Sequence, residues 1–249
     1  MLRRFLSAAL AGVLLCASAV ATERLSPALI VAQAHRAAGG EAWLKAGTNV
    51  MRGHATLCRD GKVGACMEAT RYEMYRVYPV ELAKAHAGSG KFRLDAYAGD
   101  RLLFQTAYDG ERSYDQKGPV AGERAASDEG AGFGFSAIRF ALEKGFTLEA
   151  LMDDQVEGHP SYFIRVTDPA GQTTVFGIDQ KDFSIRSAAW QTTRGWHRRI
   201  YSDFYRVGKF LQPGRVRHYY DGVKSVDIRW TSAEIGTPIP DDMFVLGPK

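Results

Sequence analysis

The sequence of 249 residues carries a formal net charge of only +4, with 45% hydrophobic and 24% charged residues. A charge so close to balance gives no electrostatic case for a nucleic-acid partner, because such partners are bound through concentrated basic surfaces. The length is sufficient for one all-β domain with a sizeable core. The order of apolar residues along the chain is therefore the main source of information.

The N-terminus has the pattern of an export signal. Arg3 and Arg4 precede an apolar run from Phe5 to Cys16, and small residues lead up to Ala21, where a signal peptidase would cut. An uncleaved membrane anchor is the alternative, but the run is shorter than the roughly 20 apolar residues of a spanning helix. A lipoprotein signal is disfavoured because a leucine, not a small residue, precedes the cysteine.

We therefore predict a cleaved signal peptide over residues 1–21 and a single domain over residues 22–249. No later segment is long and apolar enough to cross a membrane, so we expect a soluble protein outside the cytoplasm. In a Gram-negative bacterium this compartment is the periplasm.

Two of the three cysteines, Cys58 and Cys66, lie in the predicted domain, and export favours a disulfide between them. A hairpin centred on Lys62 would place them opposite each other across a wide loop. A metal site is the competing interpretation, but no His or Cys pair lies nearby at ligand spacing. We expect a structural disulfide and no bound metal.

A helix is predicted directly after the signal. Ser26 is a suitable N-cap, Pro27 suits the first helical position, and Gly39-Gly40 would end the helix. A second short turn of helix is expected over Glu41–Lys45. Strands are then expected over residues 49–58, 66–78, 91–98 and 101–108, with Gly and Asp turns between them.

The middle of the chain has weaker patterns. Residues 115–133 are rich in Gly, Ala, Ser and mixed charge and predict a loop. Ser136 could cap a helix over residues 137–144, and a second helical piece is expected near 147–152. Strands resume at Val156.

The strongest pattern lies between Thr173 and Phe244. Val226–Thr231 alternates apolar and polar residues at the period of two of a half-buried strand, and Asp221-Gly222 before it suits a tight hairpin turn. No helix-period segment here is long enough to form a crossover, so we expect an antiparallel and not a parallel sheet. We predict consecutive antiparallel strands over residues 174–179, 183–192, 199–207, 215–220 and 226–231.

Motifs for catalysis are absent from the sequence. The six histidines include no pair at i, i+4, and no glycine cluster fits a nucleophile elbow or a phosphate loop. We predict that the protein is not an enzyme. A triad assembled from distant strands would leave no local trace, so a hydrolase with a dispersed site is kept as an alternative.

Large apolar side chains on the predicted strands are numerous enough to suggest a ligand-binding face as well as a core. In this hypothesis a curved sheet closed by helices holds an apolar ligand on its concave side; the simpler alternative is an ordinary core. The candidate ligand-binding residues are Phe176, Ile178, Trp190, Tyr205, Tyr219, Ile228 and Trp230.

A second candidate surface is a basic segment around Trp196, predicted to be a hairpin tip. An indole among guanidinium groups suits lipid head groups or an acidic partner surface, although a solvated turn is the alternative. The candidate contact residues for a membrane or a partner are Arg194, Trp196, Arg198 and Arg199.

The pattern of Tyr201–Val207, Pro213-Gly214-Arg215, Tyr220-Asp221-Gly222 and Thr237–Phe244 resembles the LolA/LolB-like superfamily of exported lipoprotein-sorting and lipid-carrier proteins. Ala37–Ala42 after a helix also resembles the start of many such proteins. The resemblance implies an incomplete antiparallel β-barrel closed by a few helices, which binds acyl chains without a cofactor. It does not name the cargo.

The predicted function is thus a periplasmic, monomeric carrier of an acyl chain, lipoprotein or other lipid-like ligand. An inner- or outer-membrane protein is the expected delivery partner. The alternative is an envelope sensor or protein-interaction module that uses the Trp196 tip and has no transported ligand.

Overall fold

The computed structural model describes residues 24–45, 47–58, 65–78, 90–121 and 135–247. All fourteen strands in these residues belong to one antiparallel sheet, in the order β6-β5-β4-β3-β2-β1-β14-β13-β12-β11-β10-β9-β7, with β8 paired to β9. The strands are β1 Thr48–Cys58, β2 Cys66–Val77, β3 Lys91–Ala98, β4 Arg101–Tyr108, β5 Ser113–Asp115, β6 Gly118–Val120, β7 Thr147–Ala150, β8 Asp154–Val156, β9 His159–Thr167, β10 Thr173–Asp179, β11 Ile185–Thr192, β12 Gly195–Val207, β13 Phe210–Tyr220 and β14 Val223–Ile235.

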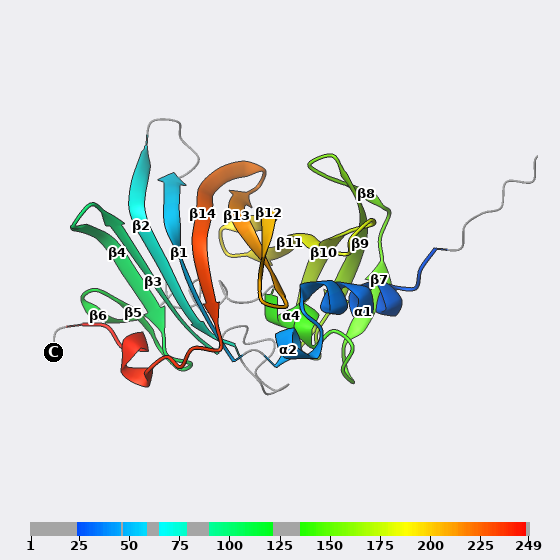
Figure 1. Ribbon diagram of the computed structural model, residues 1–249, viewed down its shortest axis with the longest axis horizontal. Helices are drawn as coiled ribbons and strands as arrows, with labels where there is room; N and C mark the ends of the chain where they lie inside the picture. The colour runs from blue at the N-terminus through cyan, green and yellow to red at the C-terminus, as the bar shows by residue number, and fades with distance from the viewer. Residues whose placement is uncertain (1–23, 46, 59–64, 79–89, 122–134, 248–249) are drawn as a thin grey trace, which may run out of the picture.

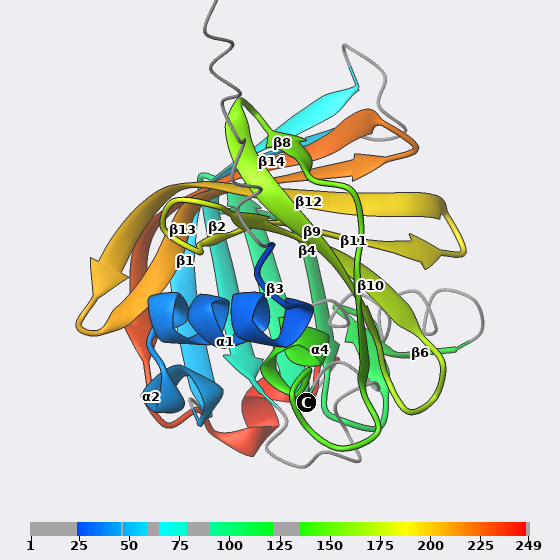
Figure 2. The ribbon, with the colours of Figure 1, turned by 90° about the vertical axis from the view of Figure 1, so that its right-hand side faces the viewer.

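The sheet is strongly curved and open. Its end strands β6 and β7 lie at opposite edges and are not paired with each other (Figure 1). The helices lie on the concave side, where α1 crosses in front of the strands (Figure 2). The predicted sheet-dominated fold with a few helices is confirmed, and the barrel is not closed.

Helix α1, Pro27–Ala38, forms where its sequence signals predict it. The hydroxyl of Ser26 accepts a hydrogen bond from the backbone N–H of Leu29 at 3.3 Å, and Gly39 ends the helix with φ 139°. Ile30 and Val31 have no exposed surface, because this side of the helix faces the sheet. The short helices α2, Glu41–Leu44, and α4, Phe135–Arg139, lie beside it and contribute Trp43 and Ile138 to the core.

The strands β1 and β14 join the two halves of the sheet. Their register shifts between Arg52 and Gly53, where β1 approaches β14 very closely. A Cβ atom at position 53 would lie 2.0 Å from the carbonyl oxygen of Arg229, so only glycine fits there. The seam between β1 and β14 therefore depends on one backbone position.

The disulfide between Cys58 and Cys66 is present, with an S–S length of 2.01 Å. It joins the facing ends of β1 and β2, whose register pairs these two residues. The prediction from spacing is confirmed, and most of the loop that the cysteines enclose lies outside the described residues, as does the predicted signal peptide.

The middle of the chain differs from its prediction in three places. Thr147–Ala150 is not helical but forms the edge strand β7, because Leu148 and Ala150 alternate with polar residues and pack against the core. Helix α4 ends at Arg139 instead of continuing to residue 144. Gly118–Val120, inside the predicted loop, pairs with β5 as strand β6; residues 122–134 lie outside the described part.

The C-terminal residues turn back along the sheet. A 3-10 helix, η3 (Asp241–Phe244), packs against β3, and Phe244 is fully buried there. Lys91 pairs with Asp241 at 2.6 Å, and Arg93 donates a hydrogen bond to the carbonyl oxygen of Met243 at 3.1 Å. In the described residues, no helix has the length and apolarity needed to cross a membrane.

Candidate ligand cavity

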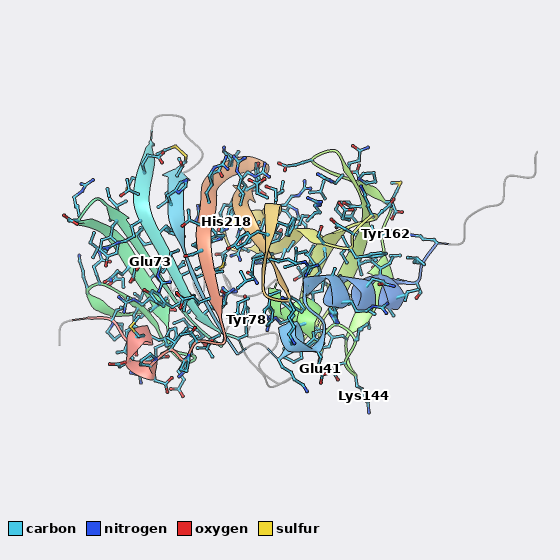
Figure 3. The ribbon with its side chains drawn as sticks, viewed as in Figure 1. Glu41, Glu73, Tyr78, Lys144, Tyr162 and His218 are labelled. Atoms are coloured by element: carbon cyan, nitrogen blue, oxygen red, sulfur yellow. A yellow bond between two sulfur atoms is a disulfide. The ribbon has the colours of Figure 1, made fainter. Side chains whose placement is uncertain are left out.

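A cavity of about 140 Å³ lies between the concave face of the sheet and the helices. Helices α1, α2 and α4 contribute Ala34, Trp43 and Arg139 to its wall, and β1 to β3 and β11 to β14 form the rest. Tyr78 and His218 also line it, at different heights of the molecule (Figure 3). The cavity therefore occupies the space between the two halves of the sheet.

Much of the cavity wall is apolar. The register of β1, β2 and β3 places Met51, Met74 and Leu94 side by side on the concave face. The opposite half of the sheet supplies Val216 and Ile228, which are also paired across strands. Such a surface attracts the apolar part of a ligand, since each methylene that leaves water contributes about 0.8 kcal/mol.

The polar part of the wall is basic. Arg76 on β2, Arg139 on α4 and Arg199 on β12 all line the cavity, and Arg76 and Arg139 are each only 7% exposed. Among the described residues that line the cavity there is no aspartate or glutamate. Three guanidinium groups from distant parts of the chain thus converge on one enclosed space.

Aromatic rings hold the side chain of Arg139 in place. Its guanidinium carbon lies 3.8 Å from the ring centre of Tyr78 and 4.6 Å from that of Trp43. Arg76 lies over the same Tyr78 ring at 5.5 Å. The negative faces of the rings stabilise both cations.

The pKa of Tyr78 reveals the sign of the local potential. Burial alone would raise the pKa of this phenol, yet its pKa is lowered, because Arg76 and Arg139 favour the phenolate. Burial, opposed by Tyr78 and assisted by the nearby charge of Arg76, lowers the pKa of Arg139 to about 10. The cavity is therefore a place where an anion is stabilised.

Two neighbouring histidines lie beside the cluster. The ring centre of His197 lies 4.4 Å from that of Tyr220, on which it stacks, 4.5 Å from that of Trp190 and 5.2 Å from that of His218. Burial, followed by the charges of Arg199 and Arg194, lowers the pKa of His197 to about 2. The pKa of His218 is lowered well below its usual value by burial and by Arg199. Both rings are neutral at physiological pH.

A second pocket, of about 260 Å³, lies on the opposite face of β12 and β13. It is larger, but its charges are already paired. Arg217 forms a bidentate ion pair with Glu157, and Arg186 donates a hydrogen bond to the carboxylate of Asp179 at 2.9 Å. This pocket has the character of a structural ion-pair network, and the concave cavity is the better candidate for a ligand site.

The structure separates the candidate ligand-binding residues into two groups. Ile228 and Trp230 line the cavity. The other five are absent from its described lining: three are buried in the core, and Tyr205 and Tyr219 are half-buried. The three core residues are Phe176, Ile178 and Trp190.

The basic segment around Trp196 is likewise divided. The tip itself is formed by Thr193 and Arg194, and Trp196 beside it is 39% exposed. Arg198 is half-buried on β12. Arg199 does not belong to the tip, because it faces the cavity and pairs in register with His218.

The cavity role of the arginines was not predicted from the sequence. A signal exists along β2 and just beyond its end, where Tyr72, Met74, Arg76 and Tyr78 follow one another at a spacing of two. On β12, His197, Arg199 and Tyr201 repeat this spacing. Arginines at this spacing share a strand face with aromatic side chains, but the spacing does not say which face is concave.

No family model and no curated protein matches the sequence. Solved structures do match the fold. A LolA superfamily protein from Nitrosomonas europaea is 12% identical, with a TM-score of 0.53 over 88% of this chain and 98% of that one. A DUF1329 family protein from Desulfovibrio piger is 11% identical, with a TM-score of 0.52 over 88% of this chain and 98% of that one. The resemblance to LolA-like proteins is confirmed at the level of the fold.

Proposed function

We propose that this protein is a non-enzymatic carrier that binds the acyl chain of a lipid-like ligand in the periplasm. The observation that carries this proposal is the cavity between the concave face of the sheet and the helices, with Met51, Met74, Ile228 and Trp230 in its wall. Similarity of the fold to a LolA superfamily protein supports it. In this proposal residues 1–21 are the export signal and residues 22–249 form one carrier domain.

The size of the cavity places a condition on this function. An engineered protein cavity of about 150 Å³ holds one benzene molecule, which is close to the volume of about 140 Å³ found here. A longer acyl chain therefore requires the helices to move away from the sheet. Helix α1 is the element to follow, because it covers the concave face and supplies Ala34 and Ala38 to the cavity wall.

Filling the cavity tests the proposal directly. Met74→Trp places a large side chain in the cavity wall without adding charge, and we expect it to abolish binding of a neutral fluorescent probe such as N-phenyl-1-naphthylamine. Met67→Trp is the matched control, because Met67 lies on the same strand and is 46% exposed. Equal probe binding by the two variants, both folded by circular dichroism, would exclude the cavity as the site.

Delivery of the ligand would use a separate surface. Trp196 and Arg194 lie at the β11–β12 tip, which is fixed to the β13–β14 turn because Asp221 accepts a hydrogen bond from the backbone N–H of Trp196 at 2.8 Å. This rigid, basic and aromatic tip suits contact with a membrane protein or with lipid head groups. Trp196→Ala should retain probe binding and reduce transfer of the ligand to acceptor vesicles.

A further inference from the structure

The chemistry of the cavity wall restricts the ligand more narrowly than an apolar cavity alone would. Arg76, Arg139 and Arg199 come from β2, α4 and β12 and face the same space. A site for an uncharged chain does not need arginines in its wall, since a cation loses hydration when it is buried. A negatively charged group bound in the cavity would compensate for the hydration that Arg76 loses on burial.

Arg76 gives the most direct indication. Its side chain is 7% exposed, and its Nε atom has no hydrogen-bond partner among the described residues. In register it pairs with Asn49 on one side and Phe92 on the other, and all three line the cavity. A buried donor on the wall of a cavity can bind an acceptor atom of a ligand.

The rest of the cluster is built to receive the same kind of group. Arg139 is held between the rings of Tyr78 and Trp43, so its planar group is already fixed before a ligand arrives. The amide of Asn49 also lines the cavity and lies 3.5 Å from that of Gln212. Guanidinium groups match the geometry of carboxylate and phosphate oxygens, with which they form paired hydrogen bonds.

The apolar part of the cavity wall would contact the rest of the ligand. Met51 and Met74 neighbour Asn49 and Arg76 at a spacing of two along β1 and β2, so polar and apolar residues form adjacent rows on one face. A cavity of about 140 Å³ suits one chain better than several. The arginines and the apolar rows together fit a molecule with one apolar tail and one negative head group.

We infer that the ligand is a single-chain anionic amphiphile, whose carboxylate or phosphate head group is bound inside the cavity by Arg76, Arg139 and Arg199. This inference rests on the proposed carrier function, which it sharpens by naming the class of ligand. The head group enters the protein, and the tail extends along the apolar rows between the two halves of the sheet.

Four amphiphiles with the same tail test the inference. Dodecanoate, dodecyl phosphate, dodecanol and dodecylammonium would each compete with the neutral probe, below their critical micelle concentrations and at neutral pH. We expect one or both anions to bind about tenfold to a hundredfold more tightly than dodecanol, because hydrogen bonds to charged groups are the strong ones. Dodecylammonium should bind most weakly. The tighter of the two anions identifies the head group.

Substitutions test whether Arg76 causes the preference for anionic ligands. Arg76→Gln should remove most of the difference between dodecanoate and dodecanol, and Arg76→Lys should retain part of it. Arg101→Gln, at an exposed arginine on β4, should leave the preference unchanged. If the Arg76 variants fail to fold, the comparison of the four ligands on the wild-type protein still decides the question.

The outcomes distinguish the two proposals. Equal binding of dodecanoate and dodecanol by the wild-type protein would overturn the anionic ligand and leave the carrier function intact. A preference for the anion that survives in folded Arg76→Gln would overturn the assignment of the head-group site. Failure of the neutral probe and of all four amphiphiles to bind would overturn the carrier function and the inference together.

Discussion

The two faces of β12 and β13 use arginine in opposite ways. On the outer face, Arg215 donates two hydrogen bonds to Asp227 at 2.7 and 2.8 Å, and Arg217 pairs with Glu157. On the concave face, Arg199 lies 5.0 Å from the ring of Trp190, and no described residue lining the cavity is acidic. Arginine thus pairs with carboxylates on one side of the sheet and lines the cavity on the other.

The surroundings of the arginines differ between the two faces. On the outer face, the attraction of a carboxylate offsets the hydration that each arginine loses on folding. The cavity arginines Arg139 and Arg199 lie against aromatic rings, whose negative faces stabilise a cation. The lowered pKa of Tyr78 near Arg76 and Arg139, set against the lowered pKa of Asp227 next to Arg215, records the two situations.

The largest expected change in stability comes from breaking an ion pair on the outer face of the sheet. Asp179 is 3% exposed and accepts hydrogen bonds from the Arg186 side chain at 2.9 Å and from the backbone N–H of Lys181 at 2.7 Å. Asp179→Ala should lower the free energy of unfolding by about 3 kcal/mol, because it removes the nearer of the two carboxylates that pair with the buried Arg186. Urea unfolding followed by tryptophan fluorescence measures this loss. A decrease well below 1 kcal/mol would show that the outer pairs are not structural.

The second largest effect is a loss of stability at low pH. The pKa of folded His197 is lowered to about 2, by burial first and then by Arg199 and Arg194, whereas the unfolded chain takes up this proton near pH 6.5. The free energy of unfolding should therefore fall as the pH falls below about 6.5, by about 1.4 kcal/mol per pH unit for this one group. His197→Phe should remove that share of the pH dependence, and the phenyl ring can still stack on Tyr220.

The measurement is urea unfolding at about pH 7 and about pH 5, where one such proton corresponds to about 2 kcal/mol. His54→Phe, at an exposed histidine of β1, should keep the pH dependence of the wild-type protein. An unchanged pH dependence in His197→Phe would mean that His197 is protonated in the folded protein, and hence that the concave face does not repel cations.

The smallest expected change in stability is on the concave side, and it has the opposite sign. Arg76→Met replaces a buried cation by an apolar side chain of similar length, so the ligand-free protein should be as stable as the wild type or more stable by about 1 kcal/mol. Delipidated protein unfolded in urea provides this value. A loss of several kcal/mol would place Arg76 among the structural arginines and remove the distinction between the two faces.

Much of the fold could be predicted because its signals are local. The alternation in Val226–Thr231, the Asp221-Gly222 turn and the Ser26 cap each depend on a few neighbouring residues, and the structure contains all three features. The edge strand Thr147–Ala150 was predicted to be helical because four residues are too few to show a period. Only its pairing with β9 establishes it as a strand.

The cavity could be predicted only in part. Ile228 and Trp230 were identified from their apolar character, but arginine is so often exposed that Arg199 was assigned to a surface tip. Its true position depends on which face of β12 turns inward, and this is decided by pairing with β11 and β13. Tertiary register, which no local pattern contains, converts a basic segment of the sequence into part of a cavity.

The seam between β1 and β14 also has a consequence for how the chain folds. Arg52 and Glu234, which pair across it, are separated by 182 positions, whereas the strands on either side are joined to their neighbours mostly by short hairpins. Closing so long a loop is entropically expensive. The two meanders, β1 to β6 and β7 to β14, should therefore form first, and the pairing of β1 with β14 should form late. A tail lying between Met51 and Val216 would touch both meanders, and its loading would slow unfolding by holding the last-formed junction together.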